Sequence, residues 1–306
     1  MVEAIASGTG KIVNSVLDKG ASFAIDLNAR VGVRILEDEH GIMGNVNVTP
    51  IIKNIAENTL NLFGYDYGLE IEVESEIPSS VGLGDSEAIS AATIMAVAGA
   101  LAKKHGSVNE LRIDKYMSEQ FLIIDDKVVD KKRLIDLCTD LSMEFDRTCA
   151  SFYGGFVISD NKKREILRRG EMESLHAVIL IPKEKMRIDL DEIKLFQNEI
   201  EIMWDEALKG NLYSAMKLNT LIYGDKIARE MLKKGSLSVT VSFPSIIALV
   251  RDERKVGDVG NSVKREGAVL TRKMNNEGAR VMVKPKKIVK IKEFLKLKGD
   301  EEFHLL

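Results

Sequence analysis

The stretch between Ile77 and Ala102 constrains the fold of this chain most. Its first part, Ile77–Gly84, contains one proline, two serines and two glycines, which is typical of a turn. Asp85-Ser86-Glu87 follows, and no charged side chain occurs from Ala88 to Ala102. A helix of this composition needs burial on most sides, and it is too short to span a bilayer, which takes about 20 residues. The stretch therefore predicts a loop leading into a core helix capped by Asp85 or a neighbour.

The rest of the chain predicts an α+β fold of two domains, because 306 residues suffice for about two cores. Apolar and polar residues largely alternate over 31–37 and 69–74, which predicts antiparallel strands, and helical spacing over 51–63 predicts a helix between them. The predicted domains are residues 1–155, which contain the loop, and residues 156–306, which end in a lysine-rich tail. Further expected strands are 156–159, 177–181, 245–250 and 279–283, and expected helices are 110–122, 131–145, 189–209 and 211–233.

Composition excludes several functional classes. Lys plus Arg (44) nearly balance Asp plus Glu (47), so the chain as a whole should attract neither nucleic acid nor an anionic membrane. The two cysteines, Cys138 and Cys149, have no paired spacing, and the four histidines are scattered, which disfavours a zinc site or a disulfide framework. We expect a cytoplasmic protein with a small-molecule partner. The oligomeric state stays open, a homodimer included.

The loop before the core helix is the best candidate for binding a ligand. Gly82 and Gly84 would let backbone N–H groups approach phosphate oxygens, and the N-terminus of a helix carries about half a positive charge. The alternative is an ordinary strand-to-helix turn. Two common phosphate loops are excluded. The only Walker A candidate, Gly10-Lys11, has Ile where the first glycine and the hydroxyl residue are required, and Glu87 breaks the Rossmann spacing.

Three blocks of the sequence resemble one family. Pro78–Ala88 resembles the second motif of the GHMP kinases, the superfamily of galactokinase, homoserine kinase and mevalonate kinase. The runs Ala6–Val16, Gly20–Leu27 and Ala150–Asn161 are similar to its archaeal-type shikimate kinase branch. The resemblance implies a two-domain GHMP kinase fold, with a ferredoxin-like C-terminal domain and an N-terminal domain like one found in a ribosomal protein. It also implies ATP and Mg²⁺ as cofactors and phosphorylation of shikimate to 3-phosphoshikimate, a step toward chorismate and the aromatic amino acids.

The resemblance also implies a set of site residues. The nucleotide would lie on the loop and helix start, formed by Pro78, Ser79, Ser80, Val81, Gly82, Leu83, Gly84, Asp85, Ser86, Glu87 and Ala88. Ser86 would bind magnesium; the alternative is a helix-capping serine. Asp146 would act as the catalytic base and Arg147 as a clamp on the phosphoryl group or a substrate carboxylate; the alternative for Asp146 is a surface ion pair. Substrate contacts would come from Lys11, Asn14, Ser22 and Asp26, residue types that also serve turns or solvated surfaces.

The sequence departs from the family pattern at three places. Asp85 and Glu87 stand where small uncharged residues are usual, and Arg147 stands where the family places its aspartate. The second glycine-rich loop is shortened to Ser238–Ser245. These departures leave two alternatives open: a kinase for homoserine or mevalonate, and a ligand-binding relative without catalysis. The tail, Lys284–Lys298, predicts a helix docked on the second domain rather than a basic surface for RNA.

Overall fold

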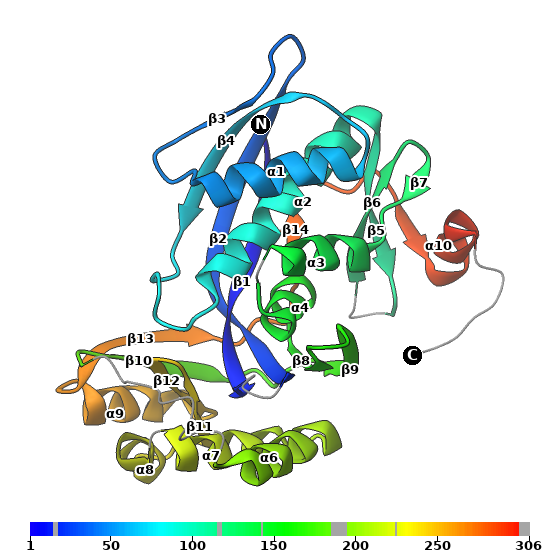
Figure 1. The fold of residues 1–306 in the computed structure, drawn as a ribbon. Coiled ribbons are helices and arrows are strands. Elements are labelled where there is room, and N and C mark those ends of the chain that lie inside the picture. The colour runs from blue at the N-terminus through cyan, green and yellow to red at the C-terminus, as the bar shows by residue number, and fades with distance from the viewer. Residues whose placement is uncertain (15–17, 115–117, 142, 185–194, 224, 300–306) are drawn as a thin grey trace.

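The computed structural model describes residues 1–14, 18–114, 118–141, 143–184, 195–223 and 225–299. Three β-sheets and the helices packed on them form this part of the chain (Figure 1). The predicted α+β class is confirmed.

The first sheet has seven strands, and the chain enters the described structure through its strand β1. Its main path is β14-β1-β2-β4-β3, and β8 and β9 extend it from β2. The two strands predicted from alternation are antiparallel as expected, and they pair with each other, with Val31 opposite Val73. The strand bounds are Val2–Val13 (β1), Lys19–Leu36 (β2), Ile42–Gly44 (β3), Gly68–Ser75 (β4), Phe156–Asp160 (β8), Glu165–Gly170 (β9) and Arg280–Val281 (β14).

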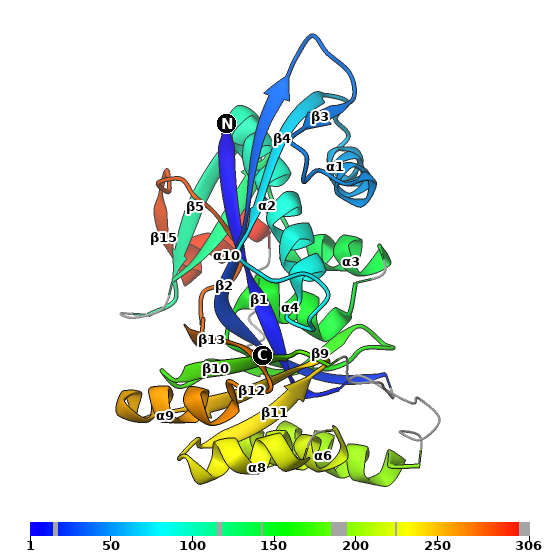
Figure 2. The same ribbon diagram turned by 90° about the vertical axis from the view of Figure 1, so that its left-hand side faces the viewer.

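Four helices pack beside this sheet: α1 (Pro50–Leu62), α2 (Asp85–His105), α3 (Lys131–Asp140) and α4 (Phe145–Tyr153). Figure 2 shows them together on one side of β1, β2 and β4. The expectation that the core helix is too short to span a bilayer is wrong, because α2 has 21 residues and is, by length and hydropathy, the one described helix that could cross a membrane. However, 78% of its apolar window is buried inside the protein. That burial is typical of a core helix and confirms the prediction made from its alanine-rich sequence.

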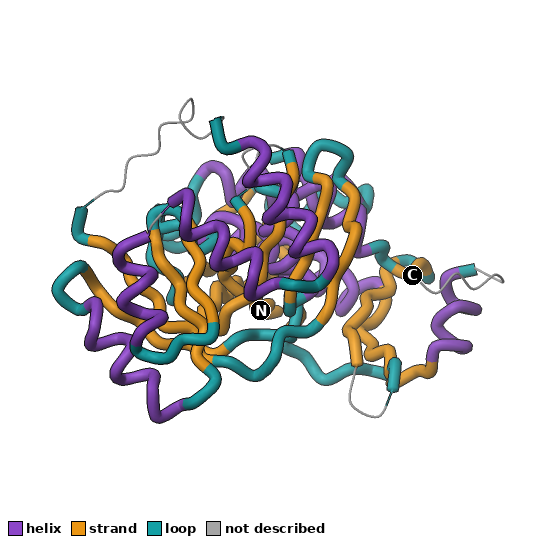
Figure 3. The backbone as a smooth tube through the Cα atoms, turned by 90° about the horizontal axis from the view of Figure 1, so that it is seen from below, coloured by secondary structure: helices purple, strands orange, loops and turns teal. Residues whose placement is uncertain are grey.

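The second sheet has the order β11-β12-β10-β13 and lies at the other end of the molecule. Its strands are His176–Pro182 (β10), Ser238–Ser242 (β11), Ser245–Val250 (β12) and Gly267–Lys273 (β13). Helices α6 (Gln197–Lys209), α7 (Leu212–Tyr223), α8 (Asp225–Lys233) and α9 (Glu253–Val263) cover its outer face, as seen from below in Figure 3.

The long strands β1 and β2 connect two hydrophobic cores. Val2 and Ala4, near the start of β1, belong to the core formed with α1–α4, whereas Ile12 and Val13 at its end pack with the second sheet and its helices. At about 3.4 Å per residue, β1 spans roughly 40 Å. The division of the chain at residue 155 stays a prediction. Strands from both sides of that residue pair in the first sheet, where Ser22 lies opposite Val157.

A third sheet changes two of the predictions. Its order is β15-β5-β6-β7, with the bounds Gly106–Arg112 (β5), Ser118–Ile124 (β6), Lys127–Val128 (β7) and Ile288–Lys290 (β15). Residues 110–122 were expected to form a helix, and that prediction is wrong, because β5 and β6 are antiparallel strands. The tail forms β15 and α10 (Ile291–Lys298), which pack on β5 and β7 and not on the second domain as expected.

Candidate active site

The predicted nucleotide loop, residues 77–84, is fixed against β1. The backbone N–H of Thr9 donates to the carbonyl of Leu83 at 2.8 Å. Gly82 and Gly84 have φ angles of +76° and +68°, in the left-handed region that favours glycine. Gly84 is the N-cap of α2, and no side chain caps it, so the expectation of a cap from Asp85 or a neighbour is wrong. The first N–H groups of a long helix are therefore left beside a glycine turn, an arrangement suited to phosphate oxygens.

The segment expected to be a shortened second loop, Ser238–Ser245, is mostly strand: Ser238–Ser242 is β11, and only Phe243 and Pro244 form the turn to β12. This turn packs directly on the first loop, where the Ser242 hydroxyl donates to the Gly82 carbonyl at 2.7 Å and the Ser245 hydroxyl donates to the Val81 carbonyl at 2.6 Å. A Cβ atom at Gly82 would lie 1.8 Å from the Phe243 carbonyl oxygen. The contact between the two loops therefore requires glycine at position 82.

A buried cluster of charged groups lies at the start of α4. The Asp146 side chain is fully buried and accepts hydrogen bonds from Lys11 Nζ at 2.9 and 2.7 Å, from the Ser22 hydroxyl at 2.6 Å and from the Asn161 amide at 3.0 Å. Gly20 on β2 leaves room for this packing, since a Cβ there would lie 2.5 Å from Asp146 Cγ. Strands β1 and β2 and the turn after β8 thus converge on one carboxylate.

The charges of this cluster compensate one another. Burial opposes ionisation of Asp146, but the Lys11 ammonium and the Ser22 hydroxyl outweigh it and hold the Asp146 pKa below its ordinary value. Glu144 is half exposed and contacts both Lys11 and Arg147. Burial opposes its ionisation as well, and the two cations hold its pKa low. The structure therefore keeps both carboxylates ionised at neutral pH.

Arg147 connects the two loops to β1. Its Nη1 donates to the Gly82 carbonyl at 3.0 Å and to the carbonyl and hydroxyl of Thr9 at 3.2 Å, and its Nη2 donates to the Ser242 hydroxyl at 3.2 Å. Its Nε donates to Glu144 at 3.3 Å. Because every nitrogen of the guanidinium contacts protein, Arg147 holds the loops in place in this structure.

The other predicted nucleotide residues divide by burial. Ser79, Ser80 and Ser86 are exposed; Pro78, Val81 and Asp85 are partly exposed; Leu83 and Ala88 are buried. Glu87 is buried as well, and burial raises its pKa more than the nearby Arg147 charge lowers it. Its carboxylate accepts a bond from the Glu144 backbone N–H at 3.4 Å. A raised pKa favours the uncharged form of Glu87, which would repel a nearby polyphosphate less than a carboxylate does.

Two of the predicted substrate residues join the Asp146 cluster and two do not. Lys11 and Ser22 contact Asp146 directly. Asn14, the residue after β1, donates to Asn219 at 3.1 Å and to the Val241 carbonyl at 3.2 Å. Asp26 is exposed and accepts a bond from Asn28, with no contact to the cluster among those found in the described residues.

Sequence reasoning missed several residues of the site. Asn161 ends a block that resembles the family, but nothing in that block indicated that its amide reaches Asp146. Ser242 lay inside the shortened loop, where only the loss of glycine was apparent. Glu144 is close to Asp146 in the sequence, yet its ion pair with Lys11 depends on strand β1 reaching α4.

A resident metal centre is not formed by protein groups alone. Within the described ranges, no three His, Cys, Asp or Glu side chains cluster in a way that could hold a metal ion. The exposed hydroxyl of Ser86 and the partly exposed Asp85 are hard oxygen donors at the start of α2. They suit a Mg²⁺ ion that shares its remaining ligands with a nucleotide.

Comparisons with known proteins agree with this geometry. Residues 50–122 match the family described as GHMP kinases N terminal domain. A shikimate kinase of Methanocella arvoryzae is 31% identical over 293 residues, covering 90% of this chain and 94% of that protein. A shikimate kinase of Methanothrix thermoacetophila is 30% identical over 263 residues, covering 81% of this chain and 85% of that protein.

Solved structures show the same fold at lower identity. The mevalonate kinase of Methanococcus jannaschii superposes with a TM-score of 0.63 at 17% identity, covering 92% of this chain and 98% of that one. The homoserine kinase of Cytophaga hutchinsonii gives 0.61 at 17% identity, covering 92% and 97%. On its sequence and its fold, the chain belongs to the GHMP kinases, among which it is similar to the archaeal shikimate kinases.

Proposed function

We propose that this GHMP kinase transfers the γ-phosphate of ATP to a hydroxyl of shikimate, giving 3-phosphoshikimate on the route to chorismate and the aromatic amino acids. The names of the two relatives support shikimate as the acceptor. The observation that carries the proposal is the buried ion pair between Asp146 on α4 and Lys11 on β1, whose charged atoms are 2.7 Å apart. The residue after Asp146 is Arg147, which donates a hydrogen bond to the Gly82 carbonyl of the loop.

Residues 78–88 would bind the nucleotide. The glycine turn and the uncapped start of α2 offer backbone N–H groups to phosphate oxygens. Ser86, with Asp85 beside it, would hold Mg²⁺. Bound Mg-ATP supplies the phosphoryl group and neutralises part of its charge. The protein contributes a fixed loop, because Thr9, Arg147 and Ser242 fasten it from three sides.

Asp146 would orient the acceptor hydroxyl and accept its proton. Lys11 keeps the carboxylate ionised, while Ser22 and Asn161 fix its rotation through hydrogen bonds. A phosphoryl-transfer transition state is loose and needs mainly positioning and charge stabilisation, so a weakly basic but well-oriented carboxylate suits the task. Asn14 and Lys11 would supply further contacts to the acceptor.

The compartment and partners follow from the same proposal. Both cysteines, Cys138 and Cys149, are free and buried, which suits a reducing cytoplasm. Shikimate and Mg-ATP would be the partners, with no nucleic acid or membrane involved.

A coupled assay of ADP release tests this function. The purified protein is given ATP and Mg²⁺ with shikimate, homoserine or mevalonate, and with no acceptor as the blank. We expect acceptor-dependent ADP release with shikimate and a phosphomonoester signal in the ³¹P NMR spectrum of the product. Release only with homoserine or mevalonate would refute shikimate as the acceptor. No release with any of them would favour the ligand-binding relative.

A further inference from the structure

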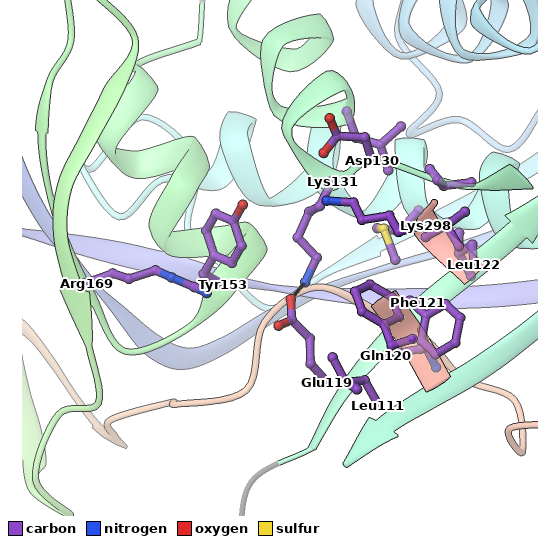
Figure 4. Close-up of a pocket in the computed structure, with 15 residues that line it drawn as sticks. Leu111, Glu119, Gln120, Phe121, Leu122, Asp130, Lys131, Tyr153, Arg169 and Lys298 are labelled. Atoms are coloured by element: carbon purple, nitrogen blue, oxygen red, sulfur yellow. Dashed lines mark hydrogen bonds and ion pairs between the residues drawn. The ribbon is translucent and has the colours of Figure 1, made fainter. Parts of the chain in front are cut away.

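A cavity of about 220 Å³ lies away from the Asp146 cluster. It is formed between the strands of the third sheet, α3, α10 and the C-terminal end of α4 (Figure 4). Neither the nucleotide loop nor Lys11, Ser22 or Asp146 lines it. The proposed kinase chemistry therefore leaves it unexplained.

One side of this cavity is apolar and sized for a ring. Met95, Leu122 and Leu134 line it and are almost fully buried. Phe121 and Phe294 form an edge-to-face pair there, with ring centroids 4.9 Å apart. A cavity of about 150 Å³ with apolar walls accommodates benzene. The volume here admits one six-membered ring and a small polar substituent.

The other side carries cations stacked on an aromatic ring. The Arg169 guanidinium lies 4.3 Å and the Lys131 ammonium 5.1 Å from the centroid of the Tyr153 ring, which they approach from different elements (Figure 4). Lys131 also pairs with Glu119; burial opposes ionisation of this carboxyl, but the charges of Lys131 and Arg169 hold its pKa below the ordinary value. Two carboxylates, Glu119 and Asp130, and three cations, Lys131, Arg169 and Lys298, line the cavity, so cations are in excess. Arg169 is exposed, and no ion pair within 4.0 Å to its guanidinium is found in the described part of the chain. Its planar N–H groups can therefore pair with a ligand carboxylate.

We propose that this cavity binds a small organic anion, a single ring bearing a carboxylate. The ring would lie among Met95, Leu122 and Leu134, and the carboxylate would pair with Arg169. Apolar contact favours the ring, and the guanidinium selects an anion over a cation of the same shape.

A larger cavity, of about 960 Å³, adjoins this one. It shares Lys131, Tyr153 and Arg169 with the smaller one. Burial raises the pKa of Tyr153, so its hydroxyl stays protonated and can donate a hydrogen bond. Tyr153 is also the last residue of α4, the helix that carries Asp146 in its first turn. A ligand in this cavity would therefore touch the helix of the proposed base from its other end.

Ligand-observed NMR tests the proposal without ATP or turnover, so its outcome is independent of the proposed function. The probes are benzoate and cyclohexanecarboxylate, with benzylamine as the cationic control and benzyl alcohol as the neutral one. We expect both carboxylates to bind, with a Kd in the roughly millimolar range normal for so few atoms. Benzylamine should bind at least about tenfold more weakly, because it places a like charge beside Arg169.

Two variants locate the binding. Arg169→Gln should weaken binding of both carboxylates about tenfold or more and leave binding of benzyl alcohol unchanged. Arg168 is an exposed neighbour on β9 that does not line the cavity, so Arg168→Gln should change the binding of neither class of probe. Val129→Phe, a change at a partly buried wall residue, should abolish binding by filling the space. Equal binding of benzoate and benzylamine, or benzoate binding that survives both Arg169→Gln and Val129→Phe, would overturn the proposal.

Discussion

Asp146 illustrates what single residues in this site depend on. The sequence predicted it as the base from its position near a family motif, but its environment comes from three separate segments that supply Lys11, Ser22 and Asn161. Lys11 and Ser22 were predicted to bind substrate, and in the structure they contact the carboxylate. The resemblance to the family pointed to these residues; the contacts among them require β1, β2 and α4 to meet, which no local pattern encodes.

Arg147 contacts the loop at Gly82 and the β11–β12 turn, and steady-state kinetics can test whether it serves ATP binding or acceptor binding. If it clamped the acceptor carboxylate, Arg147→Ala would raise KM mainly for the acceptor. Because Arg147 instead donates to the Gly82 carbonyl and Ser242, we expect the variant to raise KM for ATP about tenfold or more and KM for shikimate much less. Steady-state kinetics with each substrate varied in turn measures the split, and the reverse pattern would contradict it.

Ser86 is exposed, and its side chain forms no hydrogen bond found among the described residues. We therefore expect Ser86→Ala to leave the melting temperature nearly unchanged. Because the variant lacks the hydroxyl proposed to bind magnesium, its turnover should fall by about tenfold or more, which corresponds to roughly 1.4 kcal/mol in the barrier. A titration of activity with Mg²⁺ checks this, and turnover equal to the parent at saturating Mg²⁺ would exclude the role.

Glu87 makes stability depend on pH in a defined direction. Burial raises the pKa of Glu87 in the folded state, so folding favours the protonated side chain. The contribution of protonated Glu87 to the free energy of unfolding is therefore lost as pH rises through the folded-state pKa. Glu87→Gln stays uncharged. The free energy of unfolding of this variant, relative to the parent, should therefore rise between pH 5 and pH 8. Urea unfolding at both values measures it, with the exposed Glu57→Gln as the control.

If the difference between Glu87→Gln and the parent stays constant across these two pH values, or falls toward pH 8, burial of the carboxylate does not control its ionisation.

At the scale of elements, the sequence predicted those helices whose residues show a clear local pattern. The helix expected from the uncharged run is α2, and the helix expected over 51–63 is α1. The hairpin of β5 and β6 was missed because its polar residues lack clear alternation, and its strands are stabilised by pairing with each other and with the distant β15. The docking of the tail on this third sheet is likewise a tertiary contact.

The contact between the two loops gives a prediction at this scale. Gly82→Ala would place a Cβ 1.8 Å from the Phe243 carbonyl oxygen, on a residue with φ of +76°. Gly64→Ala is the matched control, with the same φ and no atom within 4 Å of the added Cβ. We expect Gly82→Ala to cost about 1–3 kcal/mol more stability than the control, because only it meets a steric clash.

Denaturant unfolding of both variants measures this difference. If both variants lose the same free energy of unfolding, then glycine is required at position 82 only for its backbone conformation, and the β11–β12 turn moves to accommodate the added Cβ.

At the scale of the whole molecule, the candidate active site lies where two hydrophobic cores meet. β1 runs from the α1–α4 core into the core of the second sheet, and it carries Thr9 and Lys11 at the junction. The nucleotide loop follows β4 in the first part of the chain, whereas the β11–β12 turn comes from the second. Chain length predicted two cores, but it could not predict that a single strand would contact both the loop at Leu83 and the proposed base, Asp146.

The central claim is that the Asp146–Lys11 pair serves phosphoryl transfer to shikimate. The most direct test compares ADP release by the parent and by Asp146→Asn, with shikimate and saturating Mg-ATP, after confirming that both bind ATP equally. Asparagine keeps size and polarity but removes the negative charge that orients the acceptor and takes its proton. We predict a loss of about 10²- to 10⁴-fold in turnover with ATP binding unchanged. Turnover equal to the parent in Asp146→Asn would contradict the claim.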